Sequence, residues 1–160
     1  MSTAGRFIVL EGIDGSGTTT QAARLVASLR ASGHAVLGTR EPSDGPIGVV
    51  LRQALTRRLV GLSDRALALL FAADRLDHLA SVVEPALAEG KVVVSDRYVL
   101  SSLAYQGMRM PLGWVETLNA AARRPDQTAF RAGTSRACQM PEVWLFERKP
   151  PAEMMPTDTR

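Results

Sequence analysis

Residues 11 to 21 read EGIDGSGTTTQ, a spacing suited to phosphate chemistry. From Gly12 to Gly17 the chain follows the pattern G-x-x-x-x-G-K-[ST], in which main-chain N–H groups surround phosphate oxygens. A further glycine, Gly15, helps the backbone approach a ligand closely. Thr18 stands where the pattern has lysine, so the loop keeps its main-chain donors and loses its cation.

The missing lysine matters energetically. One unit charge at about 4 Å, in an effective dielectric near 20, contributes roughly 4 kcal/mol. If this energy stabilised only the transition state, it would raise the reaction rate on the order of a thousandfold. A threonine hydroxyl contributes about 1 kcal/mol net, so Thr18 is expected to assist binding without replacing the cation. For this segment alone, a glycine-rich turn without a ligand is the alternative interpretation.

Phe71 and Arg75 form a second candidate pair, in the segment FAADR. Residues four apart share one face of a helix, so the ring and the guanidinium are expected to point the same way. Such a pair can recognise a nucleobase, since the ring stacks and the guanidinium donates to a carbonyl. A core phenylalanine beside a surface arginine is the alternative.

Asp96 and Arg97 form a third candidate pair, directly after the run KVVVS. Three consecutive valines are typical of a parallel strand that is covered on both faces. Charged groups at the end of a buried strand are costly unless they are used or paired. The two residues therefore indicate either a functional site or an ion pair that anchors the sheet edge.

The elements that must position these residues alternate between strand and helix. Apolar periodicity and capping signals predict strands at 6–10, 35–39 and 91–95, and helices at 19–30, 46–56, 63–80, 85–89, 101–106 and 112–122. This order predicts an α/β fold with a parallel sheet covered by helices on both faces. Ligands of such sheets bind beyond the carboxyl ends of the strands, where the glycine loop leaves the first one.

Composition excludes several classes of protein. With 160 residues and a net charge of +3 the chain fits one domain, and no basic run exceeds two residues, so no nucleic-acid partner is expected. The single Cys138 predicts neither a disulfide nor a metal site. The longest apolar run, 66–73, is far shorter than a membrane span, and the start lacks a signal-type segment. We expect a cytoplasmic protein without a membrane partner.

The pattern deteriorates after Pro125. Residues 127–160 show no sustained period, and the last eleven residues contain three prolines. We therefore expect a domain at 1–126 and an atypical tail at 127–160, a candidate for disorder.

Four segments, in this order and at these separations, resemble thymidylate kinase of the bacterial type: FIVLEGIDGSGTTTQ, TREPSDGPIG, LLFAADRLDHL and VVVSDRYVLSSLAYQG. The resemblance covers residues 6–126. It implies the P-loop nucleoside monophosphate kinase fold and phosphoryl transfer from ATP to dTMP, giving dTDP and ADP for dTTP synthesis. It also implies ATP and Mg²⁺ as cofactors and a homodimer.

The resemblance implies roles for individual residues. The loop that binds the ATP phosphates comprises Gly12, Ile13, Asp14, Gly15, Ser16, Gly17, Thr18, Thr19 and Thr20. Thr19 and Asp96 are expected to organise Mg²⁺, and the residues implied in catalysis are Asp96, Arg97 and Arg40. Contacts to dTMP are expected from Asp14, Arg40, Phe71, Arg75, Arg97, Ser101, Ser102, Tyr105 and Gln106.

Some of these roles are more specific in the family. Phe71 is expected to stack on thymine, Arg75 to donate to its O4, and Tyr105 to crowd the sugar 2′ position. Glu41 is expected near the metal region, and the peptide bond before Pro42 is often cis in the family.

Two features depart from the family. The first is Thr18, and the second is the end of the chain, because thymidylate kinases usually continue past 200 residues with an arginine-bearing lid, a last strand and a helix. The segment after Asp126 does not resemble that strand and lid. Our hypothesis is a truncated or frame-shifted coding sequence, which the other reading frames of the DNA would test by encoding, or failing to encode, a lid and last helix.

With both the loop lysine and the lid arginine missing, we expect weak or no turnover, although nucleotide binding survives. We also expect an exposed apolar sheet edge with low stability. The alternatives are a non-catalytic nucleotide-binding remnant and a P-loop kinase for another nucleoside monophosphate. A coupled assay with ATP and dTMP that gave normal family turnover would refute the expected impairment.

Overall fold

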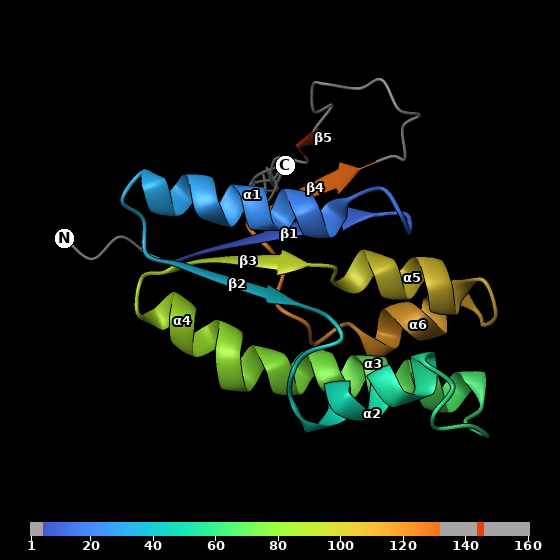
Figure 1. Ribbon diagram of the computed structural model, residues 1–160. Helices are drawn as coiled ribbons and strands as arrows, with labels where there is room; N and C mark the ends of the chain where they lie inside the picture. The colour runs from blue at the N-terminus through green and yellow to red at the C-terminus, as the bar shows by residue number, and fades with distance from the viewer. Residues whose placement is uncertain (1–4, 132–143, 146–160) are drawn as a thin grey trace, which may run out of the picture.

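The computed structural model describes residues 5–131 and the pair 144–145 (Figure 1). Its centre is a parallel sheet of β1 (Arg6–Gly12), β2 (Val36–Arg40), β3 (Val92–Asp96) and β4 (Gln127–Arg131), to which β5 (Trp144–Leu145) adds an antiparallel edge. The strand order is β2-β3-β1-β4-β5. The expected parallel α/β sheet is therefore confirmed.

Helices cover both faces of this sheet (Figure 1). One face carries α1 (Thr18–Ala31). The opposite side carries α2 (Pro46–Leu55), α3 (Asp64–His78), the π-helical turn η1 (Leu79–Val83) and α4 (Glu84–Ala88). Near the carboxyl ends of the strands lie α5 (Val99–Gly107) and α6 (Leu112–Leu118).

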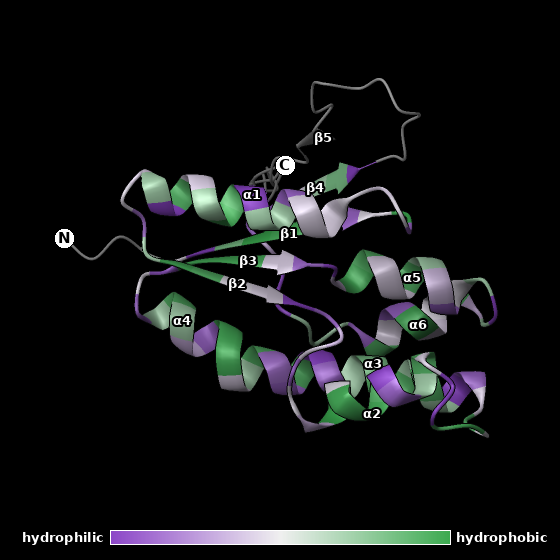
Figure 2. Ribbon diagram, in the orientation of Figure 1, coloured by the Kyte–Doolittle hydropathy of each residue, from purple (hydrophilic) through white to green (hydrophobic). Residues whose placement is uncertain are grey.

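Local sequence explains most of these elements. The apolar strands β1 and β3 run through the middle of the molecule (Figure 2), and the side chains of Val93 and Val94 are fully buried on opposite faces. The Ser63 hydroxyl oxygen accepts a hydrogen bond from the Ala66 N–H at 3.2 Å and so caps α3. Pro46 occupies the first turn of α2, where its missing N–H costs nothing.

The helix expected at 63–80 differs in its ending. Its α-helical part ends at His78 and continues through η1 into α4. Pro85 lies in the first turn of α4, and because proline has no N–H it cannot continue the regular hydrogen-bond pattern of the preceding helix. Leu79 and Val83, at the two ends of the π turn, are both buried in the core.

The expectation that regular structure ends at Asp126 is wrong for the next five residues. Residues 127–131 form β4, which pairs in parallel with β1 from Ile8 to Gly12. The Asp126 N–H donates to the Phe7 carbonyl and the Phe7 N–H donates to an Asp126 carboxylate oxygen, each at 2.8 Å, and these bonds fix the start of the strand. The expectations of disorder and of a missing lid concern residues that, apart from 144–145, lie outside the described part of the chain.

Among the described residues, no helix is both long and apolar enough to cross a bilayer.

Candidate nucleotide site

Residues 12–19, the phosphate loop, connect β1 to α1 at the carboxyl edge of the sheet. Gly15 and Gly17 have φ angles of 77° and 86°, a region that favours glycine. No described side chain caps the first turn of α1, so its N–H groups remain for an anion. Ser16 is 8% exposed, and its Oγ has no partner in the described structure. The loop therefore has the shape and the donors of an anion site.

Thr18, in the lysine position, is buried rather than extended over the loop. It is 4% exposed, and its Cγ2 lies 2.9 Å from where a Cβ on Gly12 would stand. The side chain thus fills space against the start of the loop. It brings no charge, so residues 12–19 offer main-chain donors and no cationic side chain.

Thr19 and Asp96 are brought together across 77 residues of sequence, as expected. The Thr19 hydroxyl donates to Asp96 Oδ2 at 2.6 Å, and Asp96 Oδ1 is buried without a partner in the described structure. The described residues contain no cluster of three acidic, histidine or cysteine side chains that could hold a metal ion. Mg²⁺ commonly takes one or two protein oxygens and completes its octahedron with phosphate oxygens and water. The pair therefore fits Mg²⁺ that arrives with a nucleotide.

Arg97 ties the end of β3 to the phosphate loop. Its Nη2 lies 2.9 Å from Asp14 Oδ1, and its Nη1 donates to the Gly12 carbonyl and, at 3.5 Å, to Ser101 Oγ. The residue has a φ angle of 76°, which is strained for a side chain with a Cβ and is held here by these contacts. Strain of this kind is common at functional positions.

Glu11 belongs to the same region, and our reading of the sequence did not single it out. It is 1% exposed, and its carboxylate accepts from the Ser101 hydroxyl at 2.6 Å and from the Ser101 N–H at 3.3 Å. Burial raises the pKa of this carboxyl, against the lowering effect of the Ser101 bonds. A signal was present, because Phe7, Val9 and Glu11 alternate onto one face of β1 and place a carboxylate in a core position.

Arg75 is the centre of a buried polar group, here named the Arg75 cluster: Glu41, Arg75, Tyr98, Ser102 and Asn119. Arg75 is 2% exposed. Its donors bind Glu41 Oε2 at 2.9 Å, the Tyr98 carbonyl at 3.1 Å, Ser102 Oγ at 3.0 Å and Asn119 Oδ1. The guanidinium also lies 5.2 Å from the centre of the Tyr98 ring. A guanidinium has five N–H groups, so one of them, on Nη1, makes no hydrogen bond within the described residues.

Glu41 does not lie where it was expected. Its carboxylate bonds to Arg75 instead of facing the metal pair, and its other oxygen, Oε1, is buried 3.6 Å from His78 Nδ1. The peptide bond between Glu41 and Pro42 is cis, as the family resemblance implied.

The remaining predicted acceptor residues occupy two places. Tyr105 lies near Asp14. Burial is the main cause that raises the pKa of its phenol, and the hydrogen bond to the Asp14 carboxylate raises this pKa further. Gln106, next to it on α5, has a buried Oε1 without a partner in the described structure. Arg40 pairs in register with Asp96 on the neighbouring strand, and its exposed side chain turns to Asp44, where its Nη2 bonds the carboxylate at 2.9 Å and lowers the pKa of that carboxyl. Phe71 is half-buried on α3, one turn before Arg75.

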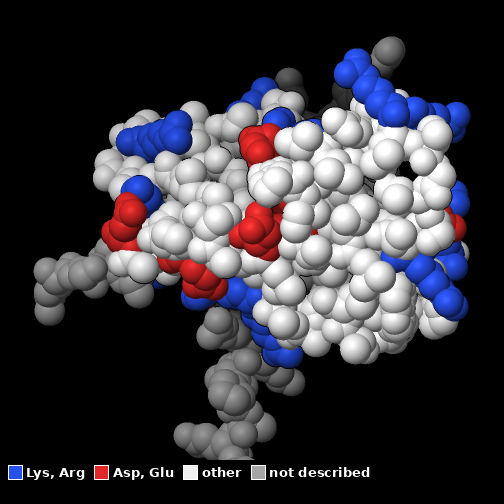
Figure 3. Space-filling model, turned by 90° about the horizontal axis from the view of Figure 1, so that it is seen from below, with Lys and Arg blue, Asp and Glu red and all other residues white. Residues whose placement is uncertain are grey.

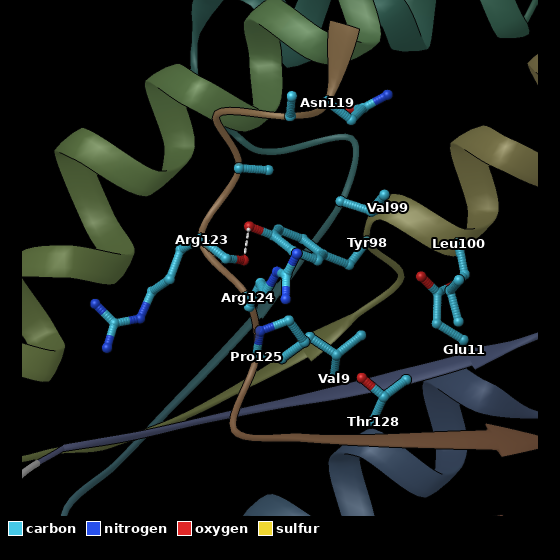
Figure 4. A pocket seen from close by; sticks show the side chains of 12 residues that line it. Val9, Glu11, Tyr98, Val99, Leu100, Asn119, Arg123, Arg124, Pro125 and Thr128 are labelled. Atoms are coloured by element: carbon cyan, nitrogen blue, oxygen red, sulfur yellow. Dashed lines mark hydrogen bonds between the residues drawn. The ribbon is translucent and has the colours of Figure 1, made fainter. Parts of the chain in front are cut away.

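A cavity of about 470 Å³ lies next to the Arg75 cluster (Figure 4). Its lining comes from β1, β4, the start of α5 and residues 119–125, and includes Glu11, Tyr98 and Asn119. The Tyr98 hydroxyl donates to the Arg123 carbonyl at 2.8 Å across this space. Phe71, Tyr105 and the phosphate loop do not line the cavity, so it does not coincide with the predicted nucleotide site.

Comparison with known proteins agrees with this geometry. The family model described as Thymidylate kinase matches residues 10–138. A probable thymidylate kinase of Pyrococcus horikoshii is 50% identical over 127 residues, which cover 76% of this chain and 62% of that relative. A thymidylate kinase of Solidesulfovibrio magneticus is 46% identical over 130 residues, covering 78% of this chain and 62% of the relative.

A solved structure gives the same result for the fold. The crystal structure of thymidylate kinase from Ehrlichia chaffeensis matches with a TM-score of 0.72 at 32% identity, over 80% of this chain and 76% of that one. The chain thus spans about 62% of the length of the curated relatives described above. Because the family match extends over more than half of its residues, this chain belongs to the thymidylate kinase family.

Proposed function

We propose that this chain transfers the γ-phosphoryl group of ATP to dTMP, giving dTDP and ADP. The observation that carries the proposal is the pair of Thr19 and Asp96, joined at 2.6 Å beside a phosphate loop with free main-chain donors. A hydroxyl and a carboxylate at this point suit a magnesium nucleotide. Family membership supports the same reaction.

The donor side of the reaction is assigned to the phosphate loop. Main-chain N–H groups of Gly15 and of residues 17–19 bind the ATP phosphates, while the Ser16 N–H stays bonded to the Ile13 carbonyl, and the positive end of α1 adds to their field. Thr19 and Asp96 hold Mg²⁺, which neutralises charge on the transferring group when it is bound. No residue of the chain forms a covalent intermediate, since phosphoryl transfer needs positioning and charge.

The acceptor side is assigned to residues on β2, α3 and α5 and to Arg97, between β3 and α5. Arg97 holds the acceptor phosphate from its place against Asp14, and Arg40 joins it by exchanging its exposed Asp44 partner for phosphate. Phe71 stacks on the base, and the remaining N–H of Arg75 donates to a base carbonyl. Tyr105, beside Asp14, selects deoxyribose by crowding the 2′ position, with Ser101, Ser102 and Gln106 along the same helix.

A homodimer is part of the proposal. Exposed apolar side chains occur on α2, α3 and η1: Val49, Leu55, Leu69, Leu76 and Val82. Seen from the side of these helices, most of the surface belongs to uncharged residues (Figure 3). A large apolar surface rimmed by polar groups is typical of a protein interface. We also place the protein in the cytoplasm, where its proposed substrates are made and used.

Titration calorimetry with dTMP and with UMP tests the acceptor assignment. We expect dTMP to bind and UMP to bind more weakly, because the thymine methyl group and the missing 2′-hydroxyl both suit this site. Equal heats for the two nucleotides would favour a kinase for another nucleoside monophosphate. No heat with dTMP at millimolar concentration, from folded protein, would contradict the proposal.

A non-catalytic nucleotide-binding protein is the second candidate function, and Thr18 is the observation that favours it. Comparing ATP turnover of the native chain with that of Thr18→Lys separates the two functions. If a lysine produces turnover where the native chain binds both nucleotides and has none, the non-catalytic function is correct. If the native chain already forms dTDP and the lysine increases the rate, the kinase is correct.

A further inference from the structure

The phosphate loop lacks a lysine, and the strand beside it ends in an arginine. Arg131, the last residue of β4, pairs in register with Gly12, the first residue of the loop. A Cβ on Gly12 would lie 2.7 Å from the Arg131 carbonyl oxygen and 2.7 Å from Ser16 Oγ. The backbone of Arg131 therefore lies directly against the loop.

Alternation along β4 decides the face on which the Arg131 side chain emerges. Ala129 packs against the core cluster of Leu10 and Ala22, which lies on the α1 side of the sheet. Thr128 lines the cavity on the opposite side. Because side chains two residues apart share a face, Arg131 emerges on the α1 side, the side on which the phosphate loop enters its helix.

The Arg131 guanidinium is not committed to another group in the described part of the chain. No ion pair or side-chain hydrogen bond within residues 5–131 involves it, and the side chain is half-buried. Arg97, the other arginine at the loop, is already bonded to Asp14 and Gly12. The buried, unpartnered Ser16 Oγ is a second polar group on the same side that awaits a ligand.

We propose that Arg131 supplies the cation that Thr18 does not, and that it binds the polyphosphate of the nucleoside triphosphate at the loop. The charge then comes from the neighbouring strand instead of from the first turn of α1. A guanidinium suits this position, since it can bind phosphate oxygens through two N–H groups at once. The inference rests on the proposed function, because it requires nucleotide phosphates at the loop.

Binding of a fluorescent ATP analogue to the full 160-residue chain tests this inference. We expect Arg131→Gln to weaken affinity about tenfold, as loss of one partly screened charge near phosphate should. Arg131→Lys should stay within about threefold of the native value, since it keeps the charge. The control is Arg6→Gln, an equal loss of charge on an exposed residue at the opposite end of the sheet, and it should not change affinity.

Thr18→Lys decides whether an effect at Arg131 is electrostatic or structural. Introduced together with Arg131→Gln, Thr18→Lys should restore the affinity for the ATP analogue. The increase in affinity that Thr18→Lys produces should be larger in the Arg131→Gln variant than in the native chain. Unchanged affinity in Arg131→Gln overturns the inference, as does a loss that Thr18→Lys cannot restore. Absence of ATP binding by the native chain, folded by circular dichroism, overturns the proposed function itself and is thereby distinguished from a failure at Arg131 alone.

Discussion

The phosphate loop and the Arg75 cluster are both polar, and they differ in how their groups are satisfied. Around the loop, Ser16 Oγ and Asp96 Oδ1 are buried without partners in the described structure, and the first turn of α1 has no side-chain cap. In the Arg75 cluster, the guanidinium makes four hydrogen bonds while almost fully buried.

Buried polar groups without partners are costly, so a ligand that supplies hydrogen-bond partners at the loop edge gains binding free energy there. In the Arg75 cluster the protein supplies partners for four of the guanidinium N–H groups, although Glu41 Oε1 is buried without one, and these bonds connect β2, α3, α5 and α6. Changes at the cluster should therefore reduce stability first, whereas changes at the loop edge should reduce turnover with little effect on folding.

The largest effect is expected for Arg75→Leu. Removing the Arg75 guanidinium leaves the Glu41 carboxylate buried without its cation, which typically costs about 3–5 kcal/mol of unfolding free energy. Urea denaturation followed by circular dichroism measures the loss. The control is Arg65→Leu on the exposed side of the same helix, which should change stability by less than about 0.5 kcal/mol. A small loss in Arg75→Leu would show that the cluster is not structural.

Asp96→Asn should have the next largest effect, on turnover and not on folding. The amide keeps the Thr19 contact and loses the charge that faces Mg²⁺, so we expect at least about a hundredfold lower dTDP formation. The affinity for dTMP should stay within about threefold. Glu116→Gln, an exposed charge on α6, is the matched control. Equal turnover in Asp96→Asn and Glu116→Gln would contradict a role of the Asp96 carboxylate in binding Mg²⁺.

Phe71→Ala should weaken dTMP binding by about tenfold to thirtyfold, because base stacking on an aromatic ring contributes roughly 1–3 kcal/mol. The affinity for ATP should not change, since Phe71 belongs to α3 and not to the phosphate loop. Leu69→Ala removes an exposed apolar side chain from the same helix and serves as the control. If dTMP binds equally well to both variants, the base does not stack on Phe71.

The smallest effect is expected for Glu11→Gln. Burial raises the pKa of Glu11 above its usual 4.5, so its neutral form is favoured in the folded state. Its contribution to stability is complete below pH 4.5 and is lost as pH rises through the raised value. The variant should therefore show a flatter stability profile from pH 4.5 upward, with a small gain in unfolding free energy at pH 7. Parallel profiles for Glu11→Gln and the native chain would contradict this.

Local patterns in the sequence were sufficient for much of the fold. The valine run predicted β3, the glycine spacing predicted the phosphate loop, and Ser63 predicted the start of α3. Each of these features depends on residues close together in the chain, so its physical cause is visible in the sequence. The proximity of Thr19 to Asp96 was expected only because the family resemblance gave both residues to one metal site.

Other features depend on contacts between distant residues and could not be predicted in this way. β4 begins with polar residues and ends in Arg131, so five residues of strand lacked an apolar signal until pairing with β1 was known. The burial of Arg75 depends on Glu41 and Asn119, which are 34 and 44 residues away. The role of Asp126 at the start of β4 likewise required the contact with Phe7.

The most direct test is to follow dTDP by phosphorus NMR in a mixture of the full chain, ATP, dTMP and Mg²⁺. The proposed function predicts dTDP and ADP in equal amounts, formed slowly by the native chain, faster by Thr18→Lys, and at least about a hundredfold more slowly by Asp96→Asn. Absence of dTDP from both the native chain and Thr18→Lys, with both proteins folded, would contradict the assignment of this chain as a thymidylate-phosphorylating enzyme.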